Sequence, residues 1–306
     1  MGKFKIAALG VLFLLALQAC RQKEKPLANT DTWLAGTAKF AGDESFEPIV
    51  DEEVYIFKAL NKQANPVITY APENDVIRLL LNDSVRLVML SRNLDSGELK
   101  VLARRNLSPV VDRFAIDAVT LIVNNVSNDT TITVAQIKQL ISGQSKSSMN
   151  IVFDNENSSL VRYLKDMAGV TDIKPKNIFA LKSNKEVIRY VSTHTGAIGI
   201  TSFSWLDDPD EDYADAVSKV KIVAVRDEAS KQYGTKYFKP SQTSLALKQY
   251  PLSRDLYIIN CTGRQGLGTG LESFMISERG QRIILKSGLL PDNIPPREIE
   301  LKSTMN

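Results

Sequence analysis

Strand-like and helix-like patterns alternate along this chain from Thr32 to the C-terminus, and this alternation constrains its fold more than any other feature. It predicts α/β layering rather than a sandwich or a helix bundle. With 306 residues the chain can form two domains of ordinary size. From the apolar spacing we expect strands at 33–38, 67–70, 85–90, 117–124, 149–152, 196–200, 220–225 and 249–260, and helices at 48–62, 75–82, 133–142, 184–192 and 271–287.

The stretch FDNENSSLVRYLKDM, residues 153–167, predicts a junction between a strand and a helix. A helix N-terminus presents unpaired backbone N–H groups and the positive end of the helix dipole, so it can bind an anion. An ordinary helix cap explains the same residues, and both interpretations stay open. The candidate N-cap residues are Asn155, Asn157, Ser158 and Ser159.

The first twenty residues, MGKFKIAALGVLFLLALQAC, have the layout of a secretory signal peptide, with an apolar core too short to span a bilayer comfortably. Their ending, Leu17-Gln18-Ala19-Cys20, resembles the lipobox of bacterial lipoproteins. The resemblance implies a signal peptide at 1–19, a Cys20 acylated with chains such as palmitate, and a flexible tether at 20–31. We therefore expect a membrane-anchored protein of the bacterial cell envelope on the periplasmic side. The alternative is a chance cysteine after a plain signal peptide.

Charge and cysteine content exclude some classes of function. Removing residues 1–19 takes away Lys3 and Lys5 and no acidic residue, which leaves 36 of the 38 basic residues against 35 acidic ones. This balance gives no basis for nucleic-acid binding. With Cys20 acylated, Cys261 is the only cysteine left, so no intramolecular disulfide is expected. Cys261 lies in the apolar run LYIINCTG and is either a buried small hydrophobe or a reactive thiol.

Three motifs, in order, resemble the phosphate-binding protein of the ABC phosphate importers and, more broadly, the type II periplasmic binding proteins. They are GAIGI at 196–200, YPLSRDLYIIN at 250–260 and LESFMISERGQRIILKSGLLP at 271–291, and the resemblance covers about residues 33–297. It implies an α/β fold of two lobes joined by two crossing strands, with ligand held in the cleft and closure by a hinge. Lobe one would be 32–117 plus 255–301, lobe two 118–254, and the crossings 117–124 and 252–260.

The resemblance also implies which residues bind the ligand. GDESFEP at 42–48 places Ser45 and Phe46 at the family's first anion-binding turn, and Asn157-Ser158-Ser159, with Asn155 before it, matches the second. These groups donate hydrogen bonds without carrying charge, which suits phosphate and many other oxygen-rich ligands.

The charged members of the family's site are not retained. Phe153 stands about where the family has an arginine, and Arg92 about where it has an aspartate that accepts from protonated phosphate. Arg92 could take over the anion contact, because a guanidinium suits bidentate recognition of oxyanions; the alternative is a solvated surface arginine. Acidic residues crowd the segment before and within the first expected helix. They either oppose an anion in the cleft or stabilise the helix dipole on an outer face: Asp43, Glu44, Glu47, Asp51, Glu52 and Glu53.

We therefore expect a lipid-anchored, monomeric solute-binding protein that captures phosphate or a related oxyanion for an ABC importer and contacts its permease. The alternative is the same scaffold acting as an envelope sensor or interaction module. An enzyme is not expected, because the single histidine, His194, lies in a polar turn and no Gly-x-Ser-x-Gly elbow is present. Gly263–Gly270 lacks the Lys-Ser/Thr of a P-loop and predicts a flexible turn. No cofactor or metal is expected, since one histidine and one free cysteine make a transition-metal site improbable on chemical grounds.

Overall fold

The computed structural model describes residues 31–145, 149–173 and 177–294. The predicted signal peptide, the lipidation site Cys20 and all but the last residue of the predicted tether lie outside the described residues. Within the described segments, every helix is too short or too polar to cross a bilayer.

One mixed sheet runs through the molecule in the strand order β2-β1-β3-β11-β4-β8-β6-β7, with β12 and β9 paired to β4 and a separate pair made by β5 and β10. The strands are β1 Ala35–Asp43, β2 Gln63–Ala71, β3 Leu87–Leu90, β4 Val110–Asn124, β5 Thr131–Thr133, β6 Asn150–Phe153, β7 Ile178–Ala180, β8 Ala197–Ser202, β9 Val220–Ile222, β10 Ala224–Arg226, β11 Ser253–Asn260 and β12 Leu290–Pro291.

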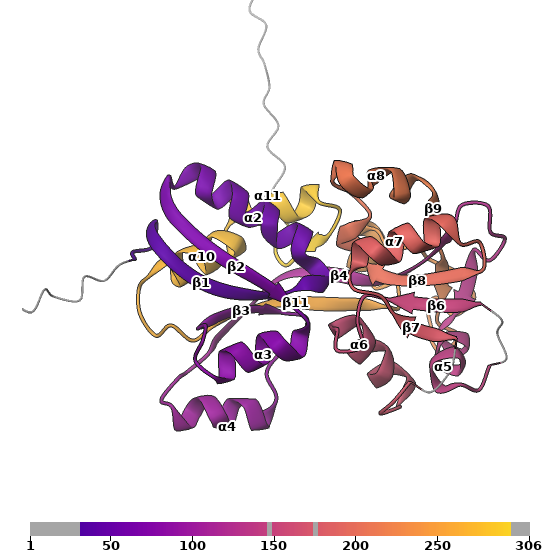
Figure 1. Cartoon of the computed structure of the whole chain (residues 1–306), viewed down its shortest axis with the longest axis horizontal. Coiled ribbons are helices and arrows are strands. Elements are labelled where there is room, and N and C mark those ends of the chain that lie inside the picture. Colours follow the sequence, from indigo (N-terminus) through magenta and orange to yellow (C-terminus); the bar gives the residue numbers. More distant parts are fainter. Residues whose placement is uncertain (1–30, 146–148, 174–176, 295–306) are drawn as a thin grey trace, which may run out of the picture.

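Helices cover the sheet in both halves of the molecule (Figure 1). They are the 3-10 turns η1 Glu44–Phe46 and η2 Phe203–Trp205, and the helices α2 Glu47–Leu60, α3 Glu73–Leu81, α4 Ser96–Arg104, α5 Val134–Ser142, α6 Ser159–Ala168, α7 Asn184–Thr193, α8 Glu211–Ser218, α9 Gln242–Ala246, α10 Leu267–Ile276 and α11 Glu278–Lys286.

The long strand β4 belongs to both halves. Its residues 110–118 pair with β11, and its residues 119–124 pair with β8 and β9. We call the half built on β1, β2, β3, β11 and the first part of β4 lobe one, and the half built on the second part of β4 with β6, β7 and β8 lobe two (Figure 1). The residue limits predicted for the two lobes stay a prediction. The largest apolar core cluster contains residues of both lobes, such as Phe57 and Leu160.

The closing helix differs from its prediction. The segment expected as one helix at 271–287 forms two, α10 and α11, which meet at Ser277. Ser277 has extended backbone angles, φ −68° and ψ 162°, and its hydroxyl accepts from the N–H of Gly280. A serine cap inside an apolar periodic segment therefore ends one helix and starts the next. The turn predicted at Gly263–Gly270 is also too long, because α10 already begins at Leu267.

One further expectation changes in detail. The strand expected at 220–225 is two short strands, β9 on β4 and β10 on β5.

Gly199, within the GAIGI motif, is approached closely by side chains of α7 and β4. A Cβ there would lie 2.7 Å from Val191, and 2.9 Å from both Val187 and Ile122. Gly199 thus lets α7 pack directly on β8.

Candidate functional site

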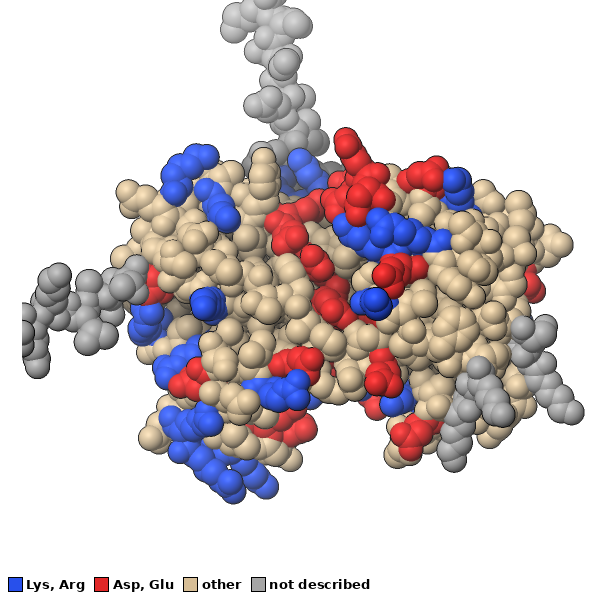
Figure 2. Space-filling view, viewed as in Figure 1, with Lys and Arg blue, Asp and Glu red and all other residues tan. Residues whose placement is uncertain are grey.

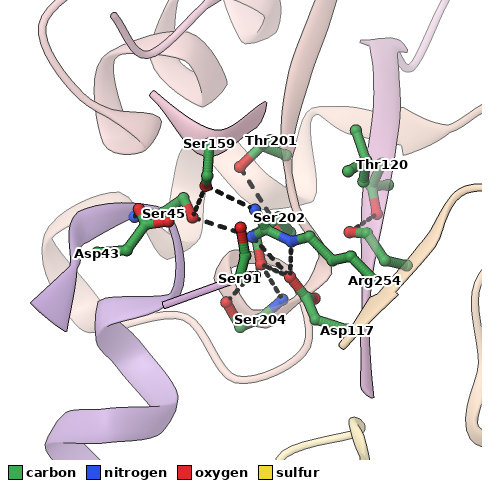
Figure 3. Close-up of polar contacts among 12 residues, drawn as sticks. Asp43, Ser45, Ser91, Asp117, Thr120, Ser159, Thr201, Ser202, Ser204 and Arg254 are labelled. Carbon is green, nitrogen blue, oxygen red and sulfur yellow. Dashed lines mark hydrogen bonds and ion pairs between the residues drawn. The ribbon is translucent and has the colours of Figure 1, made fainter. Parts of the chain in front are cut away.

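Arg254 lies at the centre of the junction between the lobes (Figure 3). It sits on β11 opposite Asp117 of β4, and its side chain is only 2% exposed. Its Nε lies 2.9 Å and its Nη2 2.8 Å from Oδ2 of Asp117. Nη1 donates to the hydroxyl of Ser159 at 2.8 Å, and Nη2 donates to the hydroxyl of Ser45 at 3.0 Å. The guanidinium therefore contacts a hydroxyl from each lobe.

The two serines are held by the starts of two helices. Ser45 lies in the turn between β1 and α2, and its N–H donates to Asp43 at 2.9 Å. Ser159 is the first residue of α6, directly after the N-cap Ser158, whose hydroxyl accepts from the N–H of Val161 at 3.2 Å. The two hydroxyl oxygens, Oγ of Ser45 and Oγ of Ser159, are 2.9 Å apart. They form a direct hydrogen bond between lobe one and lobe two.

Further contacts fix the junction. The indole N–H of Trp205, in lobe two, donates to the carbonyl of Ser45 at 2.8 Å. The hydroxyl of Ser202 donates to Oδ2 of Asp117 at 2.6 Å. The ring of Phe46 lies 5.8 Å from Cζ of Arg254, close enough for a cation–π contact. Side chains of both lobes thus contact the Arg254–Asp117 pair.

Carboxylates outnumber the guanidinium at this centre. Oδ1 of Asp117, Oδ2 of Asp43 and Oδ1 of Asp154 are buried without a partner among the described residues. Burial, with repulsion from Glu73, raises the pKa of Asp43 to about 6. Burial also raises the pKa of Asp154, and burial with repulsion from Asp154 and Asp43 raises the pKa of Glu44 to about 7. The centre is therefore rich in hydrogen-bond acceptors.

A second cluster joins the two lobes at the rim of their junction. It surrounds Glu73 of α3, whose side chain is 1% exposed. Arg162 of α6, in lobe two, binds both Glu73 oxygens, and the hydroxyl of Ser91 donates to Glu73 at 2.9 Å. Nε of Arg92 lies 3.4 Å from Glu73, and Arg92 also binds Glu98. We call these five residues the Glu73 cluster.

The predicted site residues fall into two groups. Ser45, Phe46 and Ser159 meet around Arg254, and Ser158 caps the helix beside them. Asn155 bonds to Glu44 across the junction, and its side-chain oxygen accepts from the N–H of Asn157 at 2.8 Å. The guanidinium of Arg92 is directed to Glu73 and Glu98 instead, and its predicted ligand role stays a prediction.

The acidic residues of α2 face lobe two across a groove of about 310 Å³. Figure 2 shows acidic side chains gathered along the junction. Of the two interpretations left open for these residues, the outer face does not hold for the members that line this groove: Glu47, Asp51 and Glu52, opposite Lys185, Asp208 and Asp210.

Sequence reasoning missed Arg254 and Asp117. Arg254 lies inside YPLSRDLYIIN, which served only as a marker of resemblance. The sequence carried a signal for Arg254, because it occupies the same alternating positions as the apolar residues Leu252, Leu256 and Ile258. In the structure all four are buried. An arginine on the buried face of a strand requires a partner, and β4 supplies it.

Elsewhere, the imidazole of His194 bonds to Thr193 and Tyr190 and stacks on the Tyr190 ring, with centroids 3.8 Å apart. Cys261 is 1% exposed, and burial raises the pKa of its thiol to about 11, which fits a buried hydrophobe.

Comparison with known proteins agrees with this architecture. The family model described as a PBP superfamily domain matches residues 28–279. No curated protein sequence gives a significant match. A solved structure from Clostridium perfringens, described as a phosphate ABC transporter substrate-binding protein with bound phosphate, superposes with a TM-score of 0.69 at 20% identity, covering 84% of this chain and 100% of that one.

Two other solved structures share the fold. An ABC-type phosphate transport receptor from Vibrio cholerae has a TM-score of 0.62 at 19% identity, covering 83% of this chain and 99% of that one. The regulatory domain of CcmR from Synechocystis, in complex with 2-PG, has a TM-score of 0.51 at 12% identity, covering 78% of this chain and 95% of that one. The predicted α/β fold of the type II binding proteins is thereby confirmed, and the chain belongs to the PBP superfamily.

Proposed function

We propose that this protein is a solute-binding protein that captures phosphate or a related oxyanion between its lobes and delivers it to an ABC permease. In this proposal Cys20 carries the lipid anchor, the body lies on the periplasmic side of the cell envelope, and the protein binds its ligand without transforming it. The phosphate-binding structures that share its fold support the proposal.

The observation that carries it is the position of Arg254. Its guanidinium reaches a hydroxyl of lobe one and a hydroxyl of lobe two at once. An oxyanion held by Arg254, Ser45 and Ser159 would accept the hydrogen bonds that these groups now exchange with one another. Such a ligand would couple the lobes, because each lobe contributes a donor to it.

Arg254 also suits this role better than Arg92. Arg92 binds two carboxylates, those of Glu73 and Glu98, whereas Arg254 has one carboxylate partner and two neutral hydroxyl partners. Neutral hydroxyls can turn from accepting to donating when an anion arrives, and carboxylates cannot.

A second candidate function is a sensor or interaction module on the same scaffold. It is favoured by the surplus of buried carboxylate oxygens around Arg254, which opposes a doubly charged anion. The CcmR regulatory domain, which has this fold and was solved with 2-PG, supports such a use of the scaffold.

Calorimetry of the purified protein with phosphate tests the proposal. Binding should release heat and raise the melting temperature, because a ligand that binds only the folded state stabilises it. If millimolar phosphate gives neither heat nor a higher melting temperature, the transport function is ruled out and the sensor function remains.

Two matched variants then compare the arginines. Arg254→Lys keeps the positive charge but loses the planar guanidinium, so it should weaken phosphate binding at least tenfold. Arg92→Lys should leave the affinity unchanged. A larger loss of phosphate affinity in Arg92→Lys than in Arg254→Lys would assign the anion contact to Arg92.

A further inference from the structure

A second pocket lies in lobe one, at the end of β4 that is far from lobe two. It has a volume of about 420 Å³ and lies between the first residues of β4, the last residue of β11 and the helix α10. Its lining includes two carboxylates, Asp112 and Glu272, and six neutral oxygen-bearing side chains, among them those of Asn260, Thr262 and Thr269. None of these residues contacts Arg254 or the two junction serines in the described structure.

Glu272 is the unusual member of this pocket, because it is only 5% exposed. Its Oε2 accepts from the side-chain amide of Asn260 at 2.6 Å, while its Oε1 has no hydrogen-bond partner among the described residues. Its ionisable neighbour is the carboxyl group of Asp112. Burial and this neighbour raise the pKa of Glu272 to about 7.

The strand register places Asp112 on the face of the sheet that carries Asn260, the hydrogen-bond partner of Glu272 in α10. Asp112 lies opposite Ile258 and Val110 lies opposite Asn260 in the β4–β11 register, so Asp112 and Asn260 share the face that α10 covers. The guanidinium in the lining, that of Arg264, is bound to Asp31. Two carboxylates thus face each other with no described basic side chain between them.

We propose that this pocket binds a divalent hard cation, with Ca²⁺ as the best fit, between Asp112 and Glu272. A cation there would neutralise the pair and give Oε1 of Glu272 its missing partner. The lining offers oxygen atoms and no histidine or cysteine, which excludes the ligands that Zn²⁺ and copper prefer. Mixed carboxylate, amide and hydroxyl oxygens of irregular arrangement suit Ca²⁺ better than Mg²⁺, which requires near-octahedral geometry.

The affinity should be low. No group of three or more acidic, histidine or cysteine side chains is placed to hold a metal ion in the described part of the chain. Two carboxylates must therefore be completed by neutral oxygens and water. Sites with few charged ligands bind Ca²⁺ with dissociation constants of about 10⁻⁴–10⁻³ M.

The test is thermal melting and calorimetry of the full chain in phosphate-free buffer, with CaCl2 up to 20 mM. MgCl2 and NaCl at equal ionic strength serve as salt controls. We expect a saturable rise in melting temperature with Ca²⁺ and a smaller or absent rise with Mg²⁺. Glu272→Gln and Asp112→Asn should each weaken Ca²⁺ binding at least tenfold. Without Ca²⁺, neither variant should melt below the parent protein, because each removes half of a repelling pair.

Glu47→Gln is the matched control, because it removes a carboxylate from the acidic groove beside α2 and should keep the full response to Ca²⁺. The proposal is overturned if the parent shows no saturable Ca²⁺ effect, or if NaCl reproduces it. It is also overturned if both Asp112→Asn and Glu272→Gln respond like the parent, or if Glu47→Gln loses the response as they do. Asp112 is half-buried, so its variant keeps the test valid should Glu272→Gln fail to fold.

Discussion

Two clusters join the lobes of this protein, and they do so in opposite ways. At the centre, the ion pair of Arg254 and Asp117 lies within two paired strands of lobe one, and hydrogen bonds that include the one between the neutral hydroxyls of Ser45 and Ser159 join it to lobe two. In the Glu73 cluster the ion pair itself joins the two lobes, because Glu73 lies on α3 of lobe one and Arg162 on α6 of lobe two. The side chain of Arg254 is 2% exposed, whereas that of Arg162 is 28% exposed.

The two clusters use charge for different purposes. A buried pair is costly to form and more costly to break, so it fixes geometry. In the Glu73 cluster the carboxylate of Glu73 is buried but the side chain of Arg162 is partly exposed, so water screens this pair in part and it should contribute less than the central pair. We therefore expect the Arg254–Asp117 pair to determine the stability of the fold and the contact with ligand. We expect the Glu73 cluster to adjust how readily the two lobes close.

The largest effect should come from Arg254→Met. It leaves the buried carboxylate of Asp117 without its cation, so the free energy of unfolding should fall by about 3–5 kcal/mol. Urea denaturation without ligand measures it. Adding Asp117→Asn should restore part of the loss, because the uncompensated charge is then gone. A loss below about 1 kcal/mol, too small for a buried ion pair, would contradict the contrast between centre and rim.

At the rim, Arg162→Ala should lower the free energy of unfolding by about 1–2 kcal/mol, since a charged hydrogen bond is lost but partial exposure discounts it. Arg92→Ala should cost less than about 1 kcal/mol, because Arg162 still satisfies Glu73. The same denaturation experiment checks both variants. Equal losses for Arg162→Ala and Arg254→Met would remove the distinction between the clusters.

The serines test the neutral bond between the lobes. Ser45→Ala and Ser159→Ala should each lower the free energy of unfolding by about 1 kcal/mol, the usual net value of a hydrogen bond. The double variant should lose less than the sum, because both single changes remove the same Oγ–Oγ contact. Strict additivity in this double-mutant cycle would show that the serines act independently.

The free energy of unfolding should also depend on pH. The pKa of Asp43 is raised to about 6 and that of Glu44 to about 7, so the folded state binds more protons than the unfolded state between about pH 4 and pH 7. The free energy of unfolding should therefore fall as pH rises through this range. Denaturant midpoints measured across it should change less steeply in Glu44→Gln than in the parent. An identical slope in both proteins would mean that Glu44 does not titrate in this range.

Much of the secondary structure could be predicted because its signals are local. Ser158 caps α6 next to the strand β6, as the sequence 153–167 suggested. The break at Ser277 and the roles of Gly199 could not be read in the same way, because a serine and a glycine have several uses and only the packed neighbours select one. Arg92 was a reasonable candidate from its place after a strand, yet the nearby Glu73 and Glu98 bind its guanidinium.

Local patterns specify the alternation of strands and helices, the capped start of α6 and the resemblance to binding proteins, because periodicity and capping act over a few residues. The position of Arg254 at the centre of the junction depends instead on long-range contacts. Arg254 meets residues 95, 137 and 209 positions away in the chain, namely Ser159, Asp117 and Ser45. Contacts of that range depend on strand register and lobe packing, since shifting a strand by one residue would turn Arg254 away from the junction.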